Sequence, residues 1–364
     1  MDPRVERHAE LIVDHCVDIQ ENDDVYLSAG TVAEDLVVAL HAELGKRGAN
    51  PLLSWSNSAA SRAYHREMSA DDYTLNEHSR AAMKAADALI AIRGDENTAE
   101  TSDVPPENLS AAQRANQEIQ EVRPDRWVGT QYPAPGNAQK AEMSTEEYEE
   151  FVWNAVNKDW AAQHEHQQQL VEILDDADDV RIKSGESTDV TMNISGMNAV
   201  NDDGRKNLPG GEVFTAPVPD SVEGHVTFDK PVMYLGREIN DAELTFENGE
   251  VVDYSAEQNE DALGAILDTD EGARRLGELG IGMNRDIDQF TYNMLFDEKM
   301  GDTVHMAVGR AIDDCVPEDG DVEGNESATH VDMIVDMSED SFIEVDGEVV
   351  QRDGTFRFED GFEE

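Results

Sequence analysis

The chain has 364 residues, more than one ordinary hydrophobic core accommodates, so two domains are expected. It carries 81 acidic and 27 basic residues, a formal net charge of −54, which excludes ordinary DNA or RNA binding because a phosphate backbone would be repelled. A hydrophobic content of 39% with recurring apolar segments excludes a disordered chain.

The acidic residues are spread along the whole chain, and lysine is rare among the basic ones. This pattern resembles that of halophilic cytosolic proteins, in which molar salt screens charge repulsion over roughly 3 Å. Two cysteines, Cys16 and Cys315, make no disulfide framework. There is no apolar run of 18 residues, and the first residues form a charged amphipathic helix rather than a signal peptide. We expect a cytoplasmic protein without a membrane partner.

The first half of the chain alternates between strand and helix patterns. Apolar residues at helical spacing predict helices over residues 6–20 and 31–48. Strands are predicted at 24–30 (DVYLSAG), 50–56 (NPLLSWS), 87–94 (DALIAIRG) and 126–133 (RWVGTQYP). Such alternation is typical of an α/β domain with a largely parallel sheet. None of these strands is followed by a glycine-rich phosphate-binding motif.

The pattern changes in the second half. Residues 144–175 form one long helix or a bent pair, starting at a capping box made by Ser144 and Glu147. Beyond them, 180–196 resembles a strand hairpin, and a helix over 259–277 interrupts further strands. We therefore predict an α/β domain over residues 1–178, including the helical connection, and a strand-rich α+β domain over residues 179–364.

Two dipeptides in this second domain indicate tight hairpins. Asn248-Gly249 and Asp346-Gly347 each separate alternating apolar and polar runs. Asn-Gly and Asp-Gly favour the type I′ turn, whose two central residues both need positive φ.

Of the ten histidines, His305 and His330 are the ligand candidates, and both stand in strand patterns. His305 lies where an acidic turn gives way to a short apolar strand, and His330 opens the stretch HVDM. Residues i and i+2 of a strand point to one face, so His330 and Asp332 project together. An imidazole beside a carboxylate is a half-site for a divalent metal. The spacing alone leaves open an ion pair on the sheet face.

Two glutamates lie beside glycines, where backbone can approach a ligand closely. Glu212 stands in PGGEVF, and Glu278 follows a predicted helix that stops at Gly277. A single glutamate in so acidic a chain is usually a surface residue, so only the surrounding sequence can indicate that one is a metal ligand.

Four blocks in this order carry a resemblance to a known family: GEVFTAPVPDSVEGHVTFD, DTDEGARRLGELGIGMN, FTYNMLFDEKMGDTVHMAVG and HVDM. The chain resembles the thermophilic aminopeptidases, the M29 metallopeptidases, and the opening LIVDHCVDIQENDDVYL agrees more loosely. The resemblance implies a metal-dependent aminopeptidase that releases N-terminal residues from peptides with a free N-terminus, and a homodimer. It also implies two divalent ions (zinc, cobalt or manganese), held by two glutamates, two histidines and an aspartate: Glu212, the bridging Glu278, His305, His330 and Asp332.

One position departs from the family pattern. A tyrosine usually stands seven residues after the first histidine, and here that position is Ile312. The departure leaves transition-state stabilisation and the substrate open. A different metal-dependent amide hydrolase and a non-catalytic metal-binding protein therefore remain as alternatives.

Four acidic residues are candidates for proton transfer or for supporting the imidazoles. Glu212 and Glu278 are the candidates for carrying a proton from water to the leaving amine. Asp297 and Glu298 are expected either to accept hydrogen bonds from metal-binding imidazoles or to form a solvated acidic turn.

Overall fold

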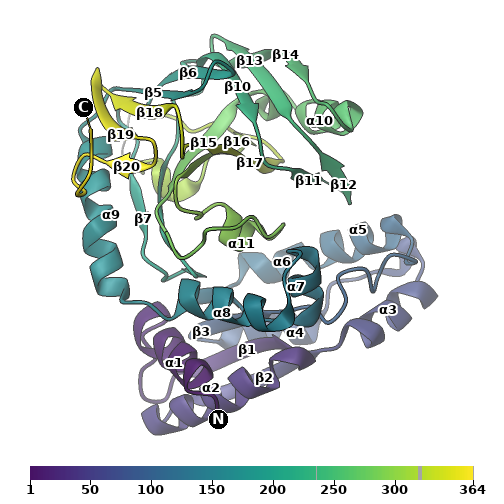
Figure 1. Ribbon diagram of the computed structural model, residues 1–364. Helices are drawn as coiled ribbons and strands as arrows, with labels where there is room; N and C mark the ends of the chain where they lie inside the picture. The colour runs from purple at the N-terminus through teal and green to yellow at the C-terminus, as the bar shows by residue number, and fades with distance from the viewer. Residues whose placement is uncertain (235, 319–321, 364) are drawn as a thin grey trace. The chain divides into compact units, whose positions relative to one another are not determined.

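The computed structural model describes residues 1–234, 236–318 and 322–363. The chain forms two compact units, residues 1–158 with 204–210 and residues 159–203 with 211–364 (Figure 1). The boundary predicted from the sequence, after residue 178, lies one helix later. The structure places helix α9 (Trp160–Asp175) in the second unit because its Leu170, Val171 and Leu174 join that unit's core.

The first unit is built on a five-stranded, entirely parallel sheet in the order β2-β1-β3-β4-β8. Its strands are β1 (Asp24–Gly30), β2 (Asn50–Ser56), β3 (Ala88–Arg93), β4 (Arg126–Gln131) and β8 (Asn207–Leu208). Its helices are α1 (Pro3–Leu11), α2 (Glu34–Arg47), α3 (Ser58–Glu67), α4 (Glu77–Ala85), α5 (Pro106–Ala115), α6 (Gln117–Glu121), α7 (Pro135–Lys140) and α8 (Thr145–Val156). The predicted parallel α/β domain is confirmed.

The long helical stretch is a pair of helices, α8 and α9, and the break has a local cause. The predicted capping box starts α8, because Ser144 Oγ accepts from Glu147 N at 3.2 Å and Glu147 accepts from Ser144 N. Asp159 then caps a new helix by accepting from the backbone N–H groups of Ala161 and Ala162. An aspartate N-cap needs non-helical backbone, so the first helix cannot run through it.

The second unit contains two larger antiparallel sheets and a short two-stranded one. The eight-stranded sheet has the order β14-β13-β10-β6-β5-β18-β19-β20, and the five-stranded sheet has the order β17-β16-β15-β9-β7. The first sheet uses β5 (Asp179–Ser184), β6 (Thr188–Asn193), β10 (Glu223–Phe228), β13 (Ala242–Glu247), β14 (Glu250–Ser255), β18 (Ser341–Val345), β19 (Glu348–Arg352) and β20 (Thr355–Phe356). The second uses β7 (Val200–Asp202), β9 (Glu212–Thr215), β15 (Leu276–Gly282), β16 (Thr303–Gly309) and β17 (His330–Asp336). Strands β11 (Val232–Tyr234) and β12 (Arg237–Ile239) pair separately, and the helices besides α9 are α10 (Glu260–Leu267) and α11 (Met294–Asp297).

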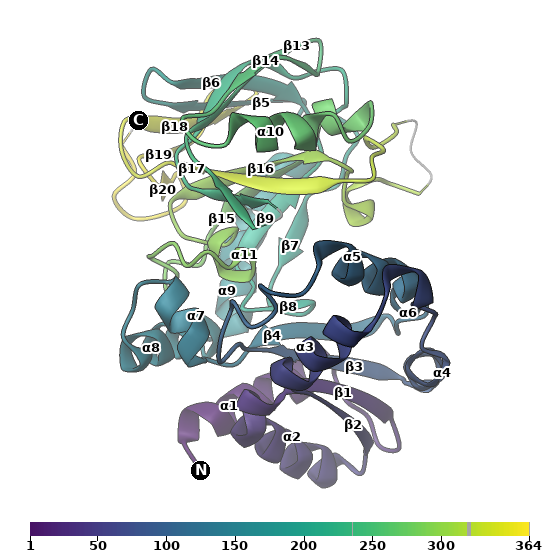
Figure 2. The same ribbon diagram turned by 90° about the vertical axis from the view of Figure 1, so that its right-hand side faces the viewer.

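The core of the second unit is shared by its two large sheets. Ile182 and Phe246 of one sheet and Leu279, Met306 and Val335 of the other belong to one buried apolar cluster. Figure 2 shows β15, β16 and β17 running beneath the eight-stranded sheet, with α10 beside them. The opposite face of the five-stranded sheet is therefore left to carry polar side chains.

Both predicted hairpins have the backbone that their dipeptides favour. Asn248 and Gly249 join β13 to β14 with φ of 51° and 78°. Asp346 and Gly347 join β18 to β19 with φ of 49° and 83°. Positive φ at both central residues fits the I′ turn. Among the helices of the described residues, none is long and apolar enough to cross a membrane.

Candidate metal centre

The polar face of the five-stranded sheet brings together side chains from four strands. Glu212 begins β9, Glu278 lies on β15, His305 on β16, and His330 and Asp332 on β17. The pairing of Gly282 with Glu212, of Gly280 with His305 and of Ala307 with Asp332 aligns these positions across the sheet. All five predicted ligands therefore meet on one face.

These side chains form two groups that have one member in common. Glu212, Glu278 and His305 offer ligand atoms within 4.8 Å of one another, and so do Glu278, His330 and Asp332. Glu278 Oε1 lies 3.6 Å from His305 Nε2, while its Oε2 lies 3.0 Å from His330 Nε2. Each oxygen of this carboxylate thus faces a different group.

The position of Glu278 corrects one sequence expectation. The predicted helix over 259–277 ends at Leu267, and Leu276–Gly282 is a strand whose residues are all buried. Its Leu279 and Ile281 face the core, while Glu278, Gly280 and Gly282 alternate onto the polar face. Glu278 therefore lies inside a strand and not behind a helix end.

Two glycines of β15 make room for the cluster. A Cβ at Gly280 would overlap the imidazole of His305, because Cε1 and Nε2 would lie far inside the van der Waals contact distance and Nδ1 would lie 2.8 Å away. A Cβ at Gly282 would overlap the carbonyl oxygen of Met300 and lie 2.9 Å from its carbonyl carbon. Glycine at these positions lets one imidazole and one loop lie directly on the strand.

The cluster is buried and rich in charge. Glu212, Glu278 and His305 are 4%, 6% and 1% exposed, so their charged forms are poorly solvated. Burial raises the pKa of the Glu212 carboxyl to about 8, although the charge of nearby Lys299 acts in the opposite direction. Burial also acts against ionisation of Glu278, but His305 and His330 outweigh it and lower its pKa to about 2.

The two histidines respond to the same carboxylates. Burial favours neutral imidazole, yet Glu278 and Glu212 raise the pKa of His305 to about 9. Asp332 and Glu278 likewise raise the pKa of His330 to about 11 against the effect of burial. The carboxylates thus create a site that attracts positive charge, which protons or metal ions can supply.

Within the described part of the chain, one of the two imidazoles is oriented by a partner at its second nitrogen. His330 Nδ1 lies 2.7 Å from the carbonyl oxygen of Arg310, which can accept its N–H. His305 Nδ1 makes no hydrogen bond with any residue that the structure describes.

The two acidic residues expected to support the imidazoles have other partners. Asp297 is buried and accepts from Thr291 N and Oγ1 at 2.7 Å each and from Asn293 N at 2.8 Å. Burial raises its pKa to about 7 against these hydrogen bonds. Glu298 is bonded to the ammonium of Lys299. The alternative of a solvated acidic turn is wrong for Asp297, which instead fixes the loop before α11.

Lys299, a lysine with no exposed surface beside the cluster, is not among the residues predicted from the sequence. Its Nζ lies 3.1 Å from Glu212 Oε1 and 3.7 Å from Asp202 Oδ2, besides its bond to Glu298. These carboxylates raise its pKa above the ordinary lysine value even though burial acts to lower it. One signal was available: in a chain with few lysines, this one lies in the turn shortly before a strand that carries a predicted ligand.

Ile312 lies outside the cluster in an apolar environment. It is half-buried and packs against Met197, Ala216, Ala311 and Cys315. Its side chain offers no hydroxyl to a bound substrate.

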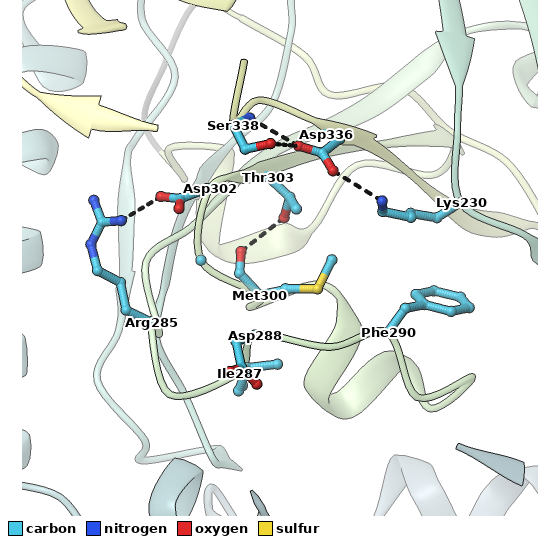
Figure 3. Close-up of a pocket in the computed structure, with 11 residues that line it drawn as sticks. Lys230, Arg285, Ile287, Asp288, Phe290, Met300, Asp302, Thr303, Asp336 and Ser338 are labelled. Carbon is cyan, nitrogen blue, oxygen red and sulfur yellow. Dashed lines mark hydrogen bonds and ion pairs between the residues drawn. The ribbon is translucent and has the colours of Figure 1, made fainter. Parts of the chain in front are cut away.

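A pocket of about 270 Å³ lies along the same sheet, near the paired residues Thr303 and Asp336 (Figure 3). Four of its charged side chains form two ion pairs, Lys230 with Asp336 at 3.0 Å and Arg285 with Asp302. None of the five predicted ligands is among the residues found to line it. Its chemistry is separate from that of the cluster.

The donor set of the cluster fits divalent metal ions. Three carboxylates and two imidazoles are oxygen and nitrogen ligands of the kind that zinc, cobalt and manganese accept. Glu212 Oε2 is buried, lies 3.4 Å from His305 Nε2, and makes no hydrogen bond with a described residue. A buried carboxylate oxygen without a hydrogen bond needs another partner, and a cation in this group would provide one.

Comparison with known proteins gives relatives along the whole chain. "Aminopeptidase 2" of Geobacillus stearothermophilus is 29% identical over 98% of both chains. The solved structure of wild-type AmpT from Thermus thermophilus superposes with a TM-score of 0.84 at 25% identity, covering 98% of this chain and 99% of that one. A 2,5-dihydroxypyridine dioxygenase from Pseudomonas putida shares the fold alone, with a TM-score of 0.62 at 12% identity over 99% of both chains.

A family profile described as "Thermophilic metalloprotease (M29)" matches residues 1–357, nearly the full length and all five cluster residues. Metallopeptidases of this family use divalent metal, which agrees with the donor set on β9, β15, β16 and β17. The chain belongs to the M29 family of metallopeptidases.

Proposed function

We propose that this chain is an aminopeptidase that holds two divalent ions in its cluster of carboxylates and imidazoles. Glu212 and His305 would hold one ion, His330 and Asp332 the other, and Glu278 would bridge both. The observation that carries the proposal is the position of Glu278, whose two oxygens face the two groups at 3.6 Å and 3.0 Å. The full-length relatives named aminopeptidases support the same reaction.

The bound ions would supply Lewis acidity for the scissile carbonyl and lower the pKa of an attacking water toward about 7. The residues of the chain have the remaining tasks. Arg310 holds the ring of His330 through its carbonyl oxygen, and Gly280 lets His305 lie flat against β15. The carboxylates of Glu212 and Glu278 are the groups that can carry a proton from water to the leaving amine.

The proposed substrates are peptides with a free N-terminus. Five ligands with three negative charges leave two dications with net positive charge, which suits a neutral amine and a polarised carbonyl as further ligands. We also propose a cytoplasmic protein adapted to high salt, in line with the distributed acidic charge. The family resemblance supports the further proposal of a homodimer.

An assay of purified protein in molar salt tests the proposal. Zinc, cobalt or manganese is added to the metal-free protein, and hydrolysis of an aminoacyl chromogenic amide is compared with that of its N-acetylated form. We expect turnover that needs metal and a free amine. Equal rates on the free and acetylated substrates, or no turnover with any of the three metals, would refute it.

A second candidate is a metal-dependent hydrolase of another amide, favoured by the apolar packing of Ile312. It uses the same metal site and differs only in substrate. A panel of peptides, aminoacyl amides and non-peptide amides separates the two, because an aminopeptidase prefers substrates with an α-amino group next to the scissile bond.

A further inference from the structure

We propose that Lys299 is a positioning residue for the metal centre: it holds one oxygen of Glu212 so that the other points at the ion. This inference rests on the part of the proposed function that makes Glu212 a ligand. It concerns a residue that cannot itself touch substrate, because Lys299 has no exposed surface.

The two oxygens of Glu212 have different surroundings. Oε1 lies 3.1 Å from Lys299 Nζ, within hydrogen-bond distance. Oε2 faces His305 Nε2 at 3.4 Å and makes no hydrogen bond with a described residue. A carboxylate held at one oxygen by a charged donor has lost rotation about its last bond, so its free oxygen keeps a fixed direction. That direction is toward the group formed with Glu278 and His305.

The backbone around Lys299 explains how it reaches Glu212. Gly282 pairs with Glu212 across β15 and β9, and the carbonyl of Met300 lies directly on Gly282. The carbonyl oxygen of Lys299 accepts from Asn284 N at 3.0 Å, which ties the loop to the end of β15. The lysine is thus fixed beside the strand partner of Glu212.

The charges around Lys299 keep it in place. Besides Glu212, its ammonium contacts Glu298 and lies 3.7 Å from Asp202 Oδ2. A buried ammonium is stable only when it is paired, and these carboxylates provide the pairing. In return the lysine offsets part of the negative charge next to the centre.

The test measures Mn²⁺ binding by isothermal titration calorimetry on metal-free protein in molar salt. In Lys299→Met, which removes the charge and the donors, we expect the affinity for one of two ions to fall about 10- to 100-fold, as for other partners of metal ligands. Lys299→Gln keeps one donor for Glu212 Oε1 and should lose less. Lys230→Met is the matched control, since Lys230 is ion-paired with Asp336 in the separate pocket and should bind Mn²⁺ like the wild type.

A double-mutant cycle shows whether Lys299 acts through Glu212. In a Glu212→Gln background, Lys299→Met should change Mn²⁺ affinity little, because the oxygen that the lysine holds in place is no longer a carboxylate ligand. Additive effects would overturn the proposal. So would wild-type Mn²⁺ affinity in Lys299→Met, or loss of the native circular dichroism spectrum in both Lys299 variants, which would mark a purely structural lysine.

The outcomes separate this inference from the proposed function. A wild-type protein that binds two Mn²⁺ ions but hydrolyses no aminoacyl amide refutes the function and leaves the role of Lys299 testable by affinity. An active wild type whose Mn²⁺ binding is unaffected by Lys299→Met refutes the inference alone.

Discussion

Substitution of Gly280 by alanine tests whether the imidazole of His305 must lie directly on β15. The added Cβ would overlap Cε1 and Nε2 of that ring and approach Nδ1 to 2.8 Å, whereas ordinary contact begins at 3.4 Å. The ring therefore has to move by about 1 Å at Nε2, the atom that faces Glu212 and Glu278. A displacement of about 1 Å in a reacting centre can lower the rate about 100-fold.

The fold should survive this change at a smaller cost. The methyl group enters the polar face of the sheet, while Leu279 and Ile281 on the opposite face keep their core contacts. We expect destabilisation of about 1–3 kcal/mol, the usual range for overpacking. A loss of activity much larger than the loss of folded protein would thus be attributable to the displaced ring.

The assay compares kcat/KM on an aminoacyl chromogenic amide with Mn²⁺ affinity and the thermal midpoint. Gly129→Ala is the matched control: Gly129 also lies within a strand, β4, but a Cβ there would meet Trp127 only at 3.7 Å. We expect activity within about twofold of wild type for the control, since its backbone is unstrained and its contacts are ordinary. Wild-type kcat/KM and Mn²⁺ affinity in Gly280→Ala would refute the assigned position of His305.

Three further predictions concern the ligands, pH and salt. Glu278→Gln and His330→Ala should each lower activity by more than the roughly 100-fold typical of residues that only hydrogen-bond a metal ligand, and each variant should keep a native circular dichroism spectrum. An active Glu278→Gln enzyme would contradict the bridging role. Burial lowers the pKa of His8 to about 3, so the unfolded chain binds the proton first as the pH falls below about 6.5. The stability that His8 contributes is therefore complete above pH 6.5 and about 2 kcal/mol smaller at pH 5; His8→Gln should flatten this part of a urea-unfolding profile, and exposed His78→Gln should not. The thermal midpoint should rise with KCl as the screening length falls from about 10 Å at 0.1 M to about 3 Å at 1 M, and a midpoint that sucrose raises as much as KCl does would contradict the charge argument.

The alternating pattern of the first half and the hairpin dipeptides of the second could be predicted because both depend on local sequence. Residues such as those of β1 and β3 carry their own strand pattern, and Asn248-Gly249 determines its turn by itself. The strand around Glu278 could not be predicted in this way. LGELGIG has three glycines, which weaken a strand in isolation. These glycines are explained by tertiary contacts, because the ring of His305 lies directly on Gly280 and the carbonyl of Met300 lies directly on Gly282.

The residues of the site could likewise be predicted from local sequence only in part. His330 and Asp332 could be paired from their spacing because a strand has a period of two. Glu212 and His305 could be added only through the family resemblance, since 93 residues separate them along the chain. Lys299 and Asp297 resemble any other charged residues of an acidic turn until the loop before β16 is folded. The loop of Lys299 packs on Gly282 of β15, and Asp297 is buried where it accepts hydrogen bonds from Thr291 and Asn293; no local pattern in the sequence expresses either arrangement.

A crystal structure of the protein soaked in Mn²⁺, with ions located by anomalous scattering, would show whether Glu278 lies between two metal ions. We expect two peaks roughly 3.5–4 Å apart, both in contact with the carboxylate of Glu278. One peak would also contact Glu212 and His305, and the other His330 and Asp332. Peaks that do not contact Glu278, or no peak at this face of the sheet at saturating Mn²⁺, would contradict it.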